Sequence, residues 1–313
     1  GTILTDDLYN KKYLDETHPV IQVMNKLGYS SMTLGNHEFN FGLELIDKLT
    51  KDADFPVLGA NVKNKSDKSD FAAPYNIIEV DGLKIGIIGV VTTNVPRWDG
   101  DKVDSLDFQA MGSTVKKYVD EIKDKVDLIV VSAHAGLAAE FDEEGKSDAA
   151  SQILVDAPEV DVLLVGHFHS VVNEEIGNTI VGAPRNSGRD VVRFDLNVDV
   201  SEEPKVIDKK VEVVDMADYD VDQTVRDLTK TAHDRTLEFI NGSTDDEGNT
   251  VGGIFGVATK DFQPKDEITG IPEGKLRDTA VVDLINKVQL KYSGADVSAA
   301  ALFKDTSDLK AGN

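Results

Sequence analysis

Cysteine is absent from this chain of 313 residues. Its absence excludes disulfide bonds and thiolate metal sites, and it fits an exposed extracellular protein without requiring one. Long apolar runs are also missing, since no stretch approaches the roughly 18 residues that a membrane-spanning helix needs. The sequence opens at Gly1-Thr2 without a methionine and shows no signal peptide, so removal of a leader by processing or trimming stays open.

Positive charge is scarce in this sequence. Lysine and arginine together number 33 against 57 aspartates and glutamates, which gives a net charge of −24. Nucleic-acid duplexes and anionic membranes need a basic surface, so we expect neither a duplex partner nor membrane insertion. An anionic substrate would have to be attracted by the local charge of a metal against the overall field.

The pattern of apolar residues in the first 200 positions predicts alternating helices and strands. The expected helices cover 19–27, 43–49, 112–125 and 149–155. The expected strands cover 31–34, 55–62, 77–80, 83–91, 126–132, 160–165, 179–183, 190–198 and 205–214. Asp81-Gly82 predicts a tight hairpin between two of these strands. This mixture indicates α/β layers around two sheets, in a chain long enough for one large domain and part of another.

The pattern of the sequence changes near residue 217, where the alternation of short helices and strands ends. A long charged helix is expected at 221–240, followed by a polar loop that reaches residue 250. A strand at 251–260 and an amphipathic helix at 277–292 are expected after it. We therefore predict a first domain at 1–216, a linker helix and loop at 217–250, and the start of a second domain at 251–313.

Four of the six histidines fall in three clusters, each directly after a predicted strand. These clusters are Asn36-His37, His134 and His167-Phe168-His169. Ligands of open α/β sheets collect at the carboxyl ends of the strands. Imidazole and amide-oxygen ligands without cysteine suit a divalent metal such as zinc, manganese, iron or cobalt. The clusters together predict a metal-dependent hydrolase.

Each cluster also has a simpler interpretation. A lone histidine after a strand, such as His134, is more often a hydrogen-bonded loop residue than a ligand. In an extended loop, His167 and His169 would point to opposite sides, which suits two neighbouring metals better than one. Gly35 before Asn36 would let the backbone approach a ligand closely. His18 and His233 lie in helix-like polar surroundings and receive no role.

Three motifs carry a family resemblance. They are Gly35-Asn36-His37-Glu38, Ser132-Ala133-His134-Ala135-Gly136 and Gly166-His167-Phe168-His169. In combination they resemble the calcineurin-like metallophosphoesterases, and within them the 5′-nucleotidase branch. Segments that resemble the bacterial-envelope 2′,3′-cyclic-nucleotide 2′-phosphodiesterase/3′-nucleotidases are 25–29, 40–43, 96–99, 268–272, 282–289 and 294–298. The resemblance implies a sandwich of two β-sheets flanked by helices, then a linker helix and an incomplete second α/β domain.

The resemblance also implies roles for single residues. Asn36, His134 and His167 would bind one of two divalent ions (manganese, zinc, iron or cobalt), and His169 would bind the other. His37 would face the phosphate and stabilise the transition state or protonate the leaving oxygen. Asn40 stands where many 5′-nucleotidases carry an aspartate that orients this histidine, so it joins His37 as a catalytic candidate.

The implied activity is the hydrolysis of 2′,3′-cyclic nucleotides to 3′-nucleotides, and of 3′-nucleotides to nucleoside and phosphate. The implied location is extracellular, cell-wall or periplasmic. A 5′-nucleotidase, a nucleotide-sugar hydrolase and a non-catalytic nucleotide-binding fragment stay open as alternatives. The oligomeric state is not readable from the sequence.

Two features depart from the family pattern. The family's Asp-x-His motif does not occur before Asn36, and Gly1-Thr2 matches residues that follow its Gly-Asp motif. At the other end, the sequence stops within the second domain. We therefore expect a fragment of a longer protein, with part of the metal site missing and activity impaired.

Overall fold

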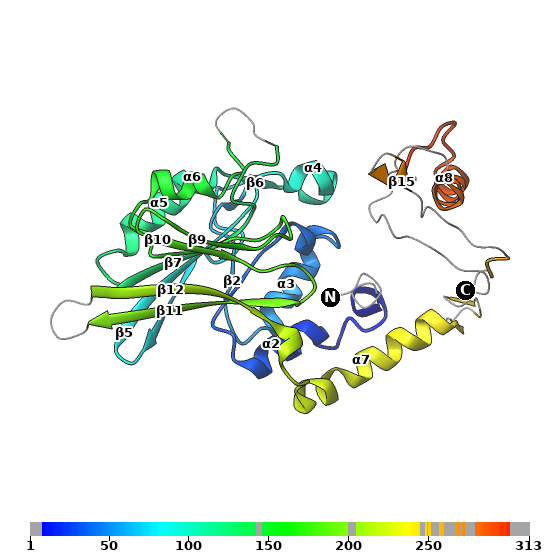
Figure 1. Cartoon of the computed structure of the whole chain (residues 1–313). Coiled ribbons are helices and arrows are strands. Elements are labelled where there is room, and N and C mark those ends of the chain that lie inside the picture. Colours follow the sequence, from blue (N-terminus) through cyan, green and yellow to red (C-terminus); the bar gives the residue numbers. More distant parts are fainter. Residues whose placement is uncertain are drawn as a thin grey trace. The chain divides into compact units, whose positions relative to one another are not determined.

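The computed structural model describes residues 8–141, 146–199, 205–244, 248, 250–251, 257–259, 267–268, 271–272 and 279–300. The chain divides into two compact units, Gly1–His233 and Asp234–Asn313 (Figure 1). Helix α7 (Gln223–Asn241) crosses the boundary between them. No described helix combines the length and the apolar character that crossing a membrane would require.

A six-stranded sheet organises the first unit. Its strands, in spatial order, are β4 (Tyr75–Val80), β5 (Leu83–Val91), β7 (Leu128–His134), β8 (Val162–Leu164), β10 (Thr179–Ala183) and β9 (Val172–Ile176). The four inner strands run parallel, and β4 and β9 pair antiparallel at the two edges. The carboxyl ends of β7 and β8 therefore lie together at one edge, which is the arrangement that the sequence predicted.

The hairpin between β4 and β5 forms at the predicted turn. Asp81 and Gly82 both have positive φ angles, 52° and 85°, and Val80 pairs with Leu83. Two consecutive positive φ angles identify the turn type that matches the twist of a β-hairpin. Glycine adopts this conformation freely and aspartate tolerates it, so the local sequence determines the turn.

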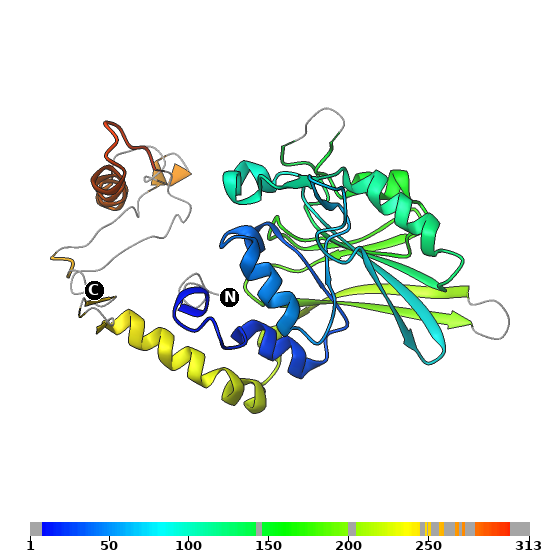
Figure 2. The ribbon, with the colours of Figure 1, turned by 180° about the vertical axis from the view of Figure 1, so that it is seen from behind.

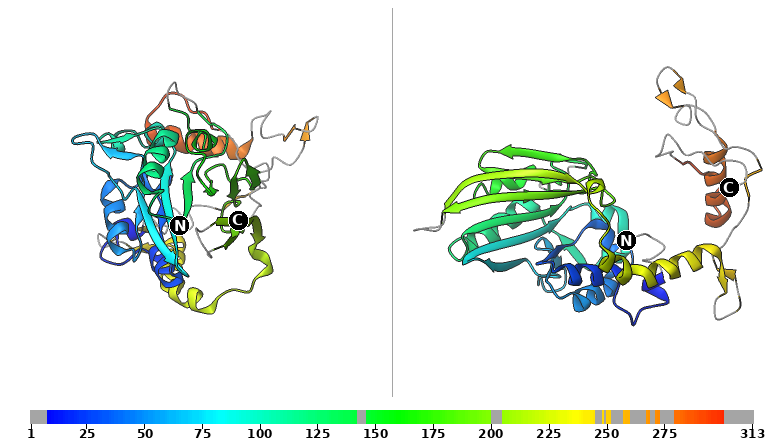
Figure 3. Two further views of the ribbon diagram at one scale, coloured as in Figure 1. Left: turned by 90° about the vertical axis from the view of Figure 1, so that its left-hand side faces the viewer. Right: turned by 60° about the horizontal axis from the view of Figure 1, so that its bottom comes forward.

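Helices cover one face of the sheet and a β-ribbon covers the other. Helices α5 (Met111–Ile122) and α6 (Ser151–Asp156) lie side by side, and their buried side chains join those of β5, β7 and β8 in one core (Figure 2). The ribbon of β11 (Asp190–Asp199) and β12 (Lys205–Asp215) forms a layer against β10 (Figure 3). A Cβ atom added at Gly182 of β10 would lie 2.6 Å from Val192 of this ribbon.

A second core holds the segment that carries Asn36. Helix α2 (Pro19–Leu27) and strand β1 (Met32–Thr33) precede this core in the chain. The elements that contribute to it are η1 (Asn36–Phe39), α3 (Leu43–Asp52), β2 (Val57–Leu58), β3 (Val62–Asn64), α4 (Val95–Asp99), η2 (Gly100–Val103) and β6 (Leu106–Phe108). Phe39 and Val62 are fully buried in it beside Phe108. The predicted helix 19–27 is confirmed, and His18 caps it with its ring nitrogen 3.3 Å from the backbone nitrogen of Val20.

The prediction of one strand at 55–62 is wrong. The segment splits into β2, which pairs parallel with β1, and β3, which pairs antiparallel with β6. Between them the buried side chain of Asn61 donates to the carbonyl oxygen of Val91 (2.7 Å) and accepts from its N–H (3.0 Å). These long-range bonds interrupt the strand. Strands β6 and β9 and helix α4 were not predicted.

The remaining elements follow the ribbon. They are η3 (Met216–Asp218), α7, β13 (Ser243–Thr244), β14 (Thr250–Val251), β15 (Glu267–Ile268), β16 (Ile271–Pro272) and α8 (Ala280–Ser293). Helix α8 begins three residues later than predicted because Thr279 caps it, and it ends at Gly294 with φ 68°. The predicted strand at 251–260 lies mostly outside the described residues. The predicted domain limits near 216 and 250 stay predictions.

The predicted fold class is confirmed for the first unit. Helices and two β layers form a mixed α/β architecture, and the histidine clusters follow strands of its central and neighbouring sheets.

Candidate functional site

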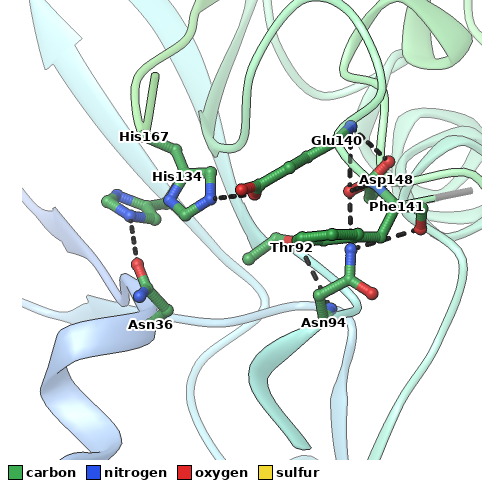
Figure 4. A network of polar contacts seen from close by, with 8 residues as sticks. All are labelled: Asn36, Thr92, Asn94, His134, Glu140, Phe141, Asp148 and His167. Atoms are coloured by element: carbon green, nitrogen blue, oxygen red, sulfur yellow. Dashed lines mark hydrogen bonds and ion pairs between the residues drawn. The ribbon is translucent and has the colours of Figure 1, made fainter. Parts of the chain in front are cut away.

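Asn36 and His134 come from segments 98 residues apart and meet at the carboxyl edge of the sheet (Figure 4). Asn36 is the first residue of η1 and is buried, and His134 is the last residue of β7. The Oδ1 atom of Asn36 lies 2.9 Å from the Nε2 atom of His134. The ring of His167, which follows β8, lies 5.3 Å from that of His134 between centroids. The structure thus brings one member of each cluster together.

Gly35 allows this approach because it has no side chain. An added Cβ atom would lie 2.9 Å from both Cε1 and Nδ1 of His134, and 2.8 Å from Oε2 of Glu38. That carboxylate accepts a hydrogen bond from the N–H of Gly35 (2.7 Å) and fixes the turn before Asn36. The φ angle of Gly35 is −104°, which any residue can adopt, so space and not backbone conformation requires glycine here.

The loop after β8 is not extended, which corrects the assumption made from the sequence. His167 has φ 66° and His169 has φ 58°. The N–H of Phe168 donates to the carbonyl oxygen of Gly166 (2.7 Å), which closes a three-residue turn around His167. Such a turn with positive φ is rare and strained. Strained backbone concentrates at functional sites, where the surrounding structure holds it.

Glu140 holds the ring of His167. Its Oε2 atom lies 2.9 Å from Nε2 of His167 (Figure 4). The loop that carries Glu140 is anchored by the buried carboxylate of Asp148, which accepts from the N–H groups of Glu140 (3.1 Å) and Phe141 (2.9 Å) and from the amide of Asn94 (2.5 Å). Three donors on one buried carboxylate make this anchor rigid.

His37 is oriented by a chain of two further residues. The Oδ1 atom of Asn40 lies 2.8 Å from Nδ1 of His37, and the Nδ2 atom of Asn40 donates to both oxygens of Asp99 (3.0 and 3.2 Å). Because Asp99 accepts only, the amide oxygen of Asn40 must face His37, whose Nδ1–H then donates. Within the part of the chain that the structure describes, no hydrogen bond reaches Nε2 of the exposed His37. Asp99 is buried, and Lys102 also approaches its Oδ1 atom, at 3.3 Å.

The pKa of His134 is lowered from its ordinary 6.5 to about 4, chiefly by burial and to a smaller extent by the neighbouring imidazoles of His167, His37 and His169. His134 is therefore neutral near pH 7, which is the form in which imidazole binds a metal. His169 is exposed and makes no hydrogen bond to the other site residues in the described part of the chain.

The donor set fits a divalent ion in part. Two ligands with bonds of about 2.1 Å lie roughly 3 Å apart when they are neighbours around one ion. The 2.9 Å between Oδ1 of Asn36 and Nε2 of His134 has this spacing. His167 directs its Nε2 atom to Glu140, and no group of three histidine, aspartate or glutamate residues within the described ranges is arranged to hold a metal. Asn36 and His134 thus supply two donors for one ion, and the ring of His167 lies beside them.

The sequence model of a family described as the bacterial capsule synthesis protein PGA_cap matches residues 2–181. The chain belongs to the PGA_cap family. The fold of this PGA_cap chain is similar to the crystal structure of the calcineurin-like phosphoesterase YfkN from Bacillus subtilis, with a TM-score of 0.70 and 27% identity over 76% of this chain and 81% of that one. The resemblance to calcineurin-like phosphoesterases is thereby confirmed.

Relatives of this PGA_cap chain carry nucleotide phosphoesterase names. The trifunctional nucleotide phosphoesterase YfkN of Bacillus subtilis (strain 168) is 28% identical over 72% of this chain and 17% of its own length. A 2′,3′-cyclic-nucleotide 2′-phosphodiesterase/3′-nucleotidase of Salmonella typhimurium is 33% identical over 55% of this chain and 28% of its own length. The cell wall protein Lmo0130 of Listeria monocytogenes is 28% identical over 91% of this chain and 40% of its own length. The chain thus spans less than half the length of each.

Three carboxylates of the PGA_cap chain were missed by the sequence analysis. Asp99 lay inside the segment 96–99 that carried part of the resemblance, yet its contact with Asn40 spans 59 residues. Glu140 and Asp148 lie in a loop without periodicity, so the pattern of the sequence gave them no signal.

Proposed function

We propose that this protein hydrolyses phosphate esters of nucleotides with the help of divalent metal, and that 2′,3′-cyclic nucleotides and 3′-nucleotides are its substrates. The observation that carries the proposal is the contact between Asn36 and His134 beside the ring of His167, at the carboxyl edge of the sheet. The family description names capsule synthesis, which is a process and not a reaction, so the reaction is argued from this site and from the relatives' names.

Asn36, His134 and His167 would hold one ion, and His169 would hold a second. Manganese, zinc, iron and cobalt all suit imidazole and amide donors. When bound, such ions activate water and neutralise charge on the phosphoryl oxygens. The neutral state of His134 and the fixed position of Asn36 prepare the protein's own part of that site.

His37 would interact with the leaving oxygen of the phosphate ester. Its Nδ1–H is engaged by Asn40, so its Nε2 atom would hydrogen-bond the phosphate or pass a proton to the departing oxygen. Asn40 alone cannot stabilise a positive ring by charge. Asp99 accepts both hydrogen bonds from the Asn40 amide, so a carboxylate stands behind the residue that replaces the aspartate of many 5′-nucleotidases. Lys102 pairs with the same carboxylate at 3.3 Å and shares its charge.

Exposed aromatic side chains beside the site favour a substrate that contains an aromatic ring. Trp98 packs 5.4 Å from the ring of His167 and 6.4 Å from that of Phe141 between centroids, and both Trp98 and Phe141 are more than a third exposed. Aromatic faces stack on nucleobases without regard to their identity. A nucleotide whose phosphate bound at the histidines would have the rings of Trp98 and Phe141 close enough for its base to stack on.

We further propose that the protein acts in the cell envelope, because Lmo0130 is named a cell wall protein and the sequence has no cysteine. Residues 217–250 would link the phosphoesterase domain to the start of a second domain.

The test is hydrolysis in manganese of 2′,3′-cyclic AMP, 3′-AMP, 5′-AMP and a nucleotide sugar, by the wild type, His134→Ala and the control His233→Ala. His233 is exposed on α7 and has no assigned role. Metal-dependent turnover of the cyclic and 3′-substrates that His134→Ala abolishes and His233→Ala keeps would support the proposal. A preference for 5′-AMP or the nucleotide sugar would favour the alternative enzymes, and nucleotide binding without turnover would favour a binding module.

A further inference from the structure

The contact between Glu140 and His167 determines which nitrogen of that ring can bind an ion. A carboxylate only accepts hydrogen bonds, so the Nε2 atom of His167, 2.9 Å from Oε2 of Glu140, must carry the proton. A neutral imidazole has a single N–H, which leaves the lone pair on Nδ1. We propose that Glu140 is a positioning residue that holds His167 in this tautomer, so that Nδ1 is the metal ligand. The inference rests on the proposed metal-dependent function.

The ring of His167 lies between Glu140 and His134. In Figure 4 its Nε2 atom faces the carboxylate of Glu140, and its Nδ1 atom lies on the side of His134. The centroids of the two imidazole rings are 5.3 Å apart, and Nε2 of His134 lies 2.9 Å from Oδ1 of Asn36. The lone pair on Nδ1 is therefore on the side of the ring where the other two candidate donors lie.

The two loops that carry the carboxylate and the imidazole are also joined through their backbones. The N–H of Gly166 donates to the carbonyl oxygen of Ala135 (3.0 Å), which ties the loop after β8 to the loop after β7. A Cβ atom added at Gly136 would lie 2.5 Å from the ring of Phe168, so this ring packs directly on the backbone of the neighbouring loop. The two side chains thus meet because both backbones are held, independently of the hydrogen bond between them.

The hydrogen bond is placed where it can orient the ring. The side chain of His167 is only 14% exposed, and Trp98 packs beside its ring at 5.4 Å between centroids. The N–H of Glu140 donates to the buried carboxylate of Asp148 (3.1 Å), so the Glu140 side chain reaches the ring from a fixed position. Hydrogen bonds to a charged acceptor are the stronger kind. Histidines that bind metals commonly donate their second ring N–H to a carboxylate in this way.

Glu140 itself is not placed to bind the ion together with the histidines. No set of three histidine, aspartate or glutamate side chains in the described parts of the chain is arranged to hold a metal. In Figure 4 its carboxylate and the ring of His134 lie on opposite sides of the His167 ring. The carboxylate therefore acts through His167, by keeping the proton on Nε2.

The test begins with the metal-free chain, labelled with ¹⁵N in its histidine side chains. Two-bond ¹H–¹⁵N correlation spectra at a pH of about 8, where imidazole is neutral, report which ring nitrogen carries the proton. The variant His167→Gln assigns the signals. We expect the wild type to hold His167 as the Nε2–H tautomer alone. Added zinc should shift the Nδ1 resonance of His167 and leave the proton on Nε2.

Matched variants separate positioning from charge. Glu140→Ala should average the two tautomers of His167 and raise the Kd for zinc, measured by calorimetry, about 10–100-fold. Glu140→Gln removes the charge but keeps an oxygen that accepts from Nε2–H, so it should restore both the tautomer and most of the affinity. Glu79→Ala removes the same charge from an exposed position of β4 that pairs with Lys84 near the start of β5, at the opposite edge of the sheet. Its Kd should match the wild type.

The outcomes distinguish this proposal from the proposed function. Zinc that shifts Nε2 of His167 in place of Nδ1, or a Glu140→Ala variant with wild-type tautomer and Kd, would overturn the positioning role and leave the metal site standing. Equal losses of affinity in Glu140→Ala and Glu140→Gln would assign the effect to charge and also reject that role. Zinc that moves no resonance of His134 or His167 would reject the proposed metal site itself, and the positioning role with it.

Discussion

Replacing Gly35 with alanine tests whether the approach of Asn36 to His134 depends on a missing side chain. The new Cβ atom would lie 2.9 Å from two atoms of the His134 ring and 2.8 Å from Oε2 of Glu38. Real Cβ atoms do not approach so closely, so the ring or the loop must move. Glu38 can swing its carboxylate away, but His134 ends a buried strand and its ring is packed between Asn36 and His167.

Overpacking of this kind costs about 1–3 kcal/mol. For a unit of this size we expect Gly35→Ala to lower Tm by roughly 2–4 °C per kcal/mol, and to weaken metal binding because the His134 ring leaves its place. The assays are thermal unfolding and a manganese titration. Gly166→Ala is the matched control, because an added Cβ there meets nothing within 4 Å. If Gly35→Ala kept wild-type Tm and metal affinity, or Gly166→Ala lost as much, the reasoning would be refuted.

Two further variants and one comparison across pH give specific predictions. His37→Ala should lower turnover about 10²–10⁴-fold without loss of metal, and metal content that fell with the rate would make His37 a ligand. Asp99→Asn should lower kcat and leave metal content unchanged, and an unchanged kcat would remove Asp99 from the chain behind His37. Hydrogen bonds from Arg185 lower the pKa of Asp190 from 3.8 to about 2, so this carboxylate stabilises the fold above pH 3.8 and its contribution disappears toward pH 2. The Tm difference between wild type and Asp190→Asn should shrink over that range, and a constant difference would contradict the assignment.

The elements that the sequence predicted well have local causes. Asp81-Gly82 determines its own turn, and the helix 19–27 has proline at its start and Gly28 at its end. The strand expected at 55–62 failed because Asn61 bonds to Val91, thirty residues away, and no local pattern records such a contact. Strand β9 reads Val-Asn-Glu-Glu-Ile and lies at an exposed edge, so it lacks the apolar alternation that marks a strand.

The candidate site was likewise predictable where its residues follow a local pattern, and not where they depend on long-range contacts. The histidines and Asn36 were recognisable because they follow strands that end at a shared edge, and the family motifs are specific. Their supporting residues were not recognisable, because Glu140 reaches His167 across 27 positions and Asp99 reaches Asn40 across 59. The left-handed backbone of His167 and His169 also escaped prediction, since tertiary contacts and not residue type impose it. Metal binding by these residues stays a prediction.

The central claim is that Asn36, His134 and His167 hold a divalent ion. Crystals of the chain soaked in zinc, with diffraction measured on both sides of the zinc absorption edge, locate the metal directly. We expect an anomalous peak about 2.1 Å from Oδ1 of Asn36 and from Nε2 of His134, with the ring of His167 as the third donor. Zinc found only at surface carboxylates, with Asn36 and His134 still hydrogen-bonded to each other, would contradict the account.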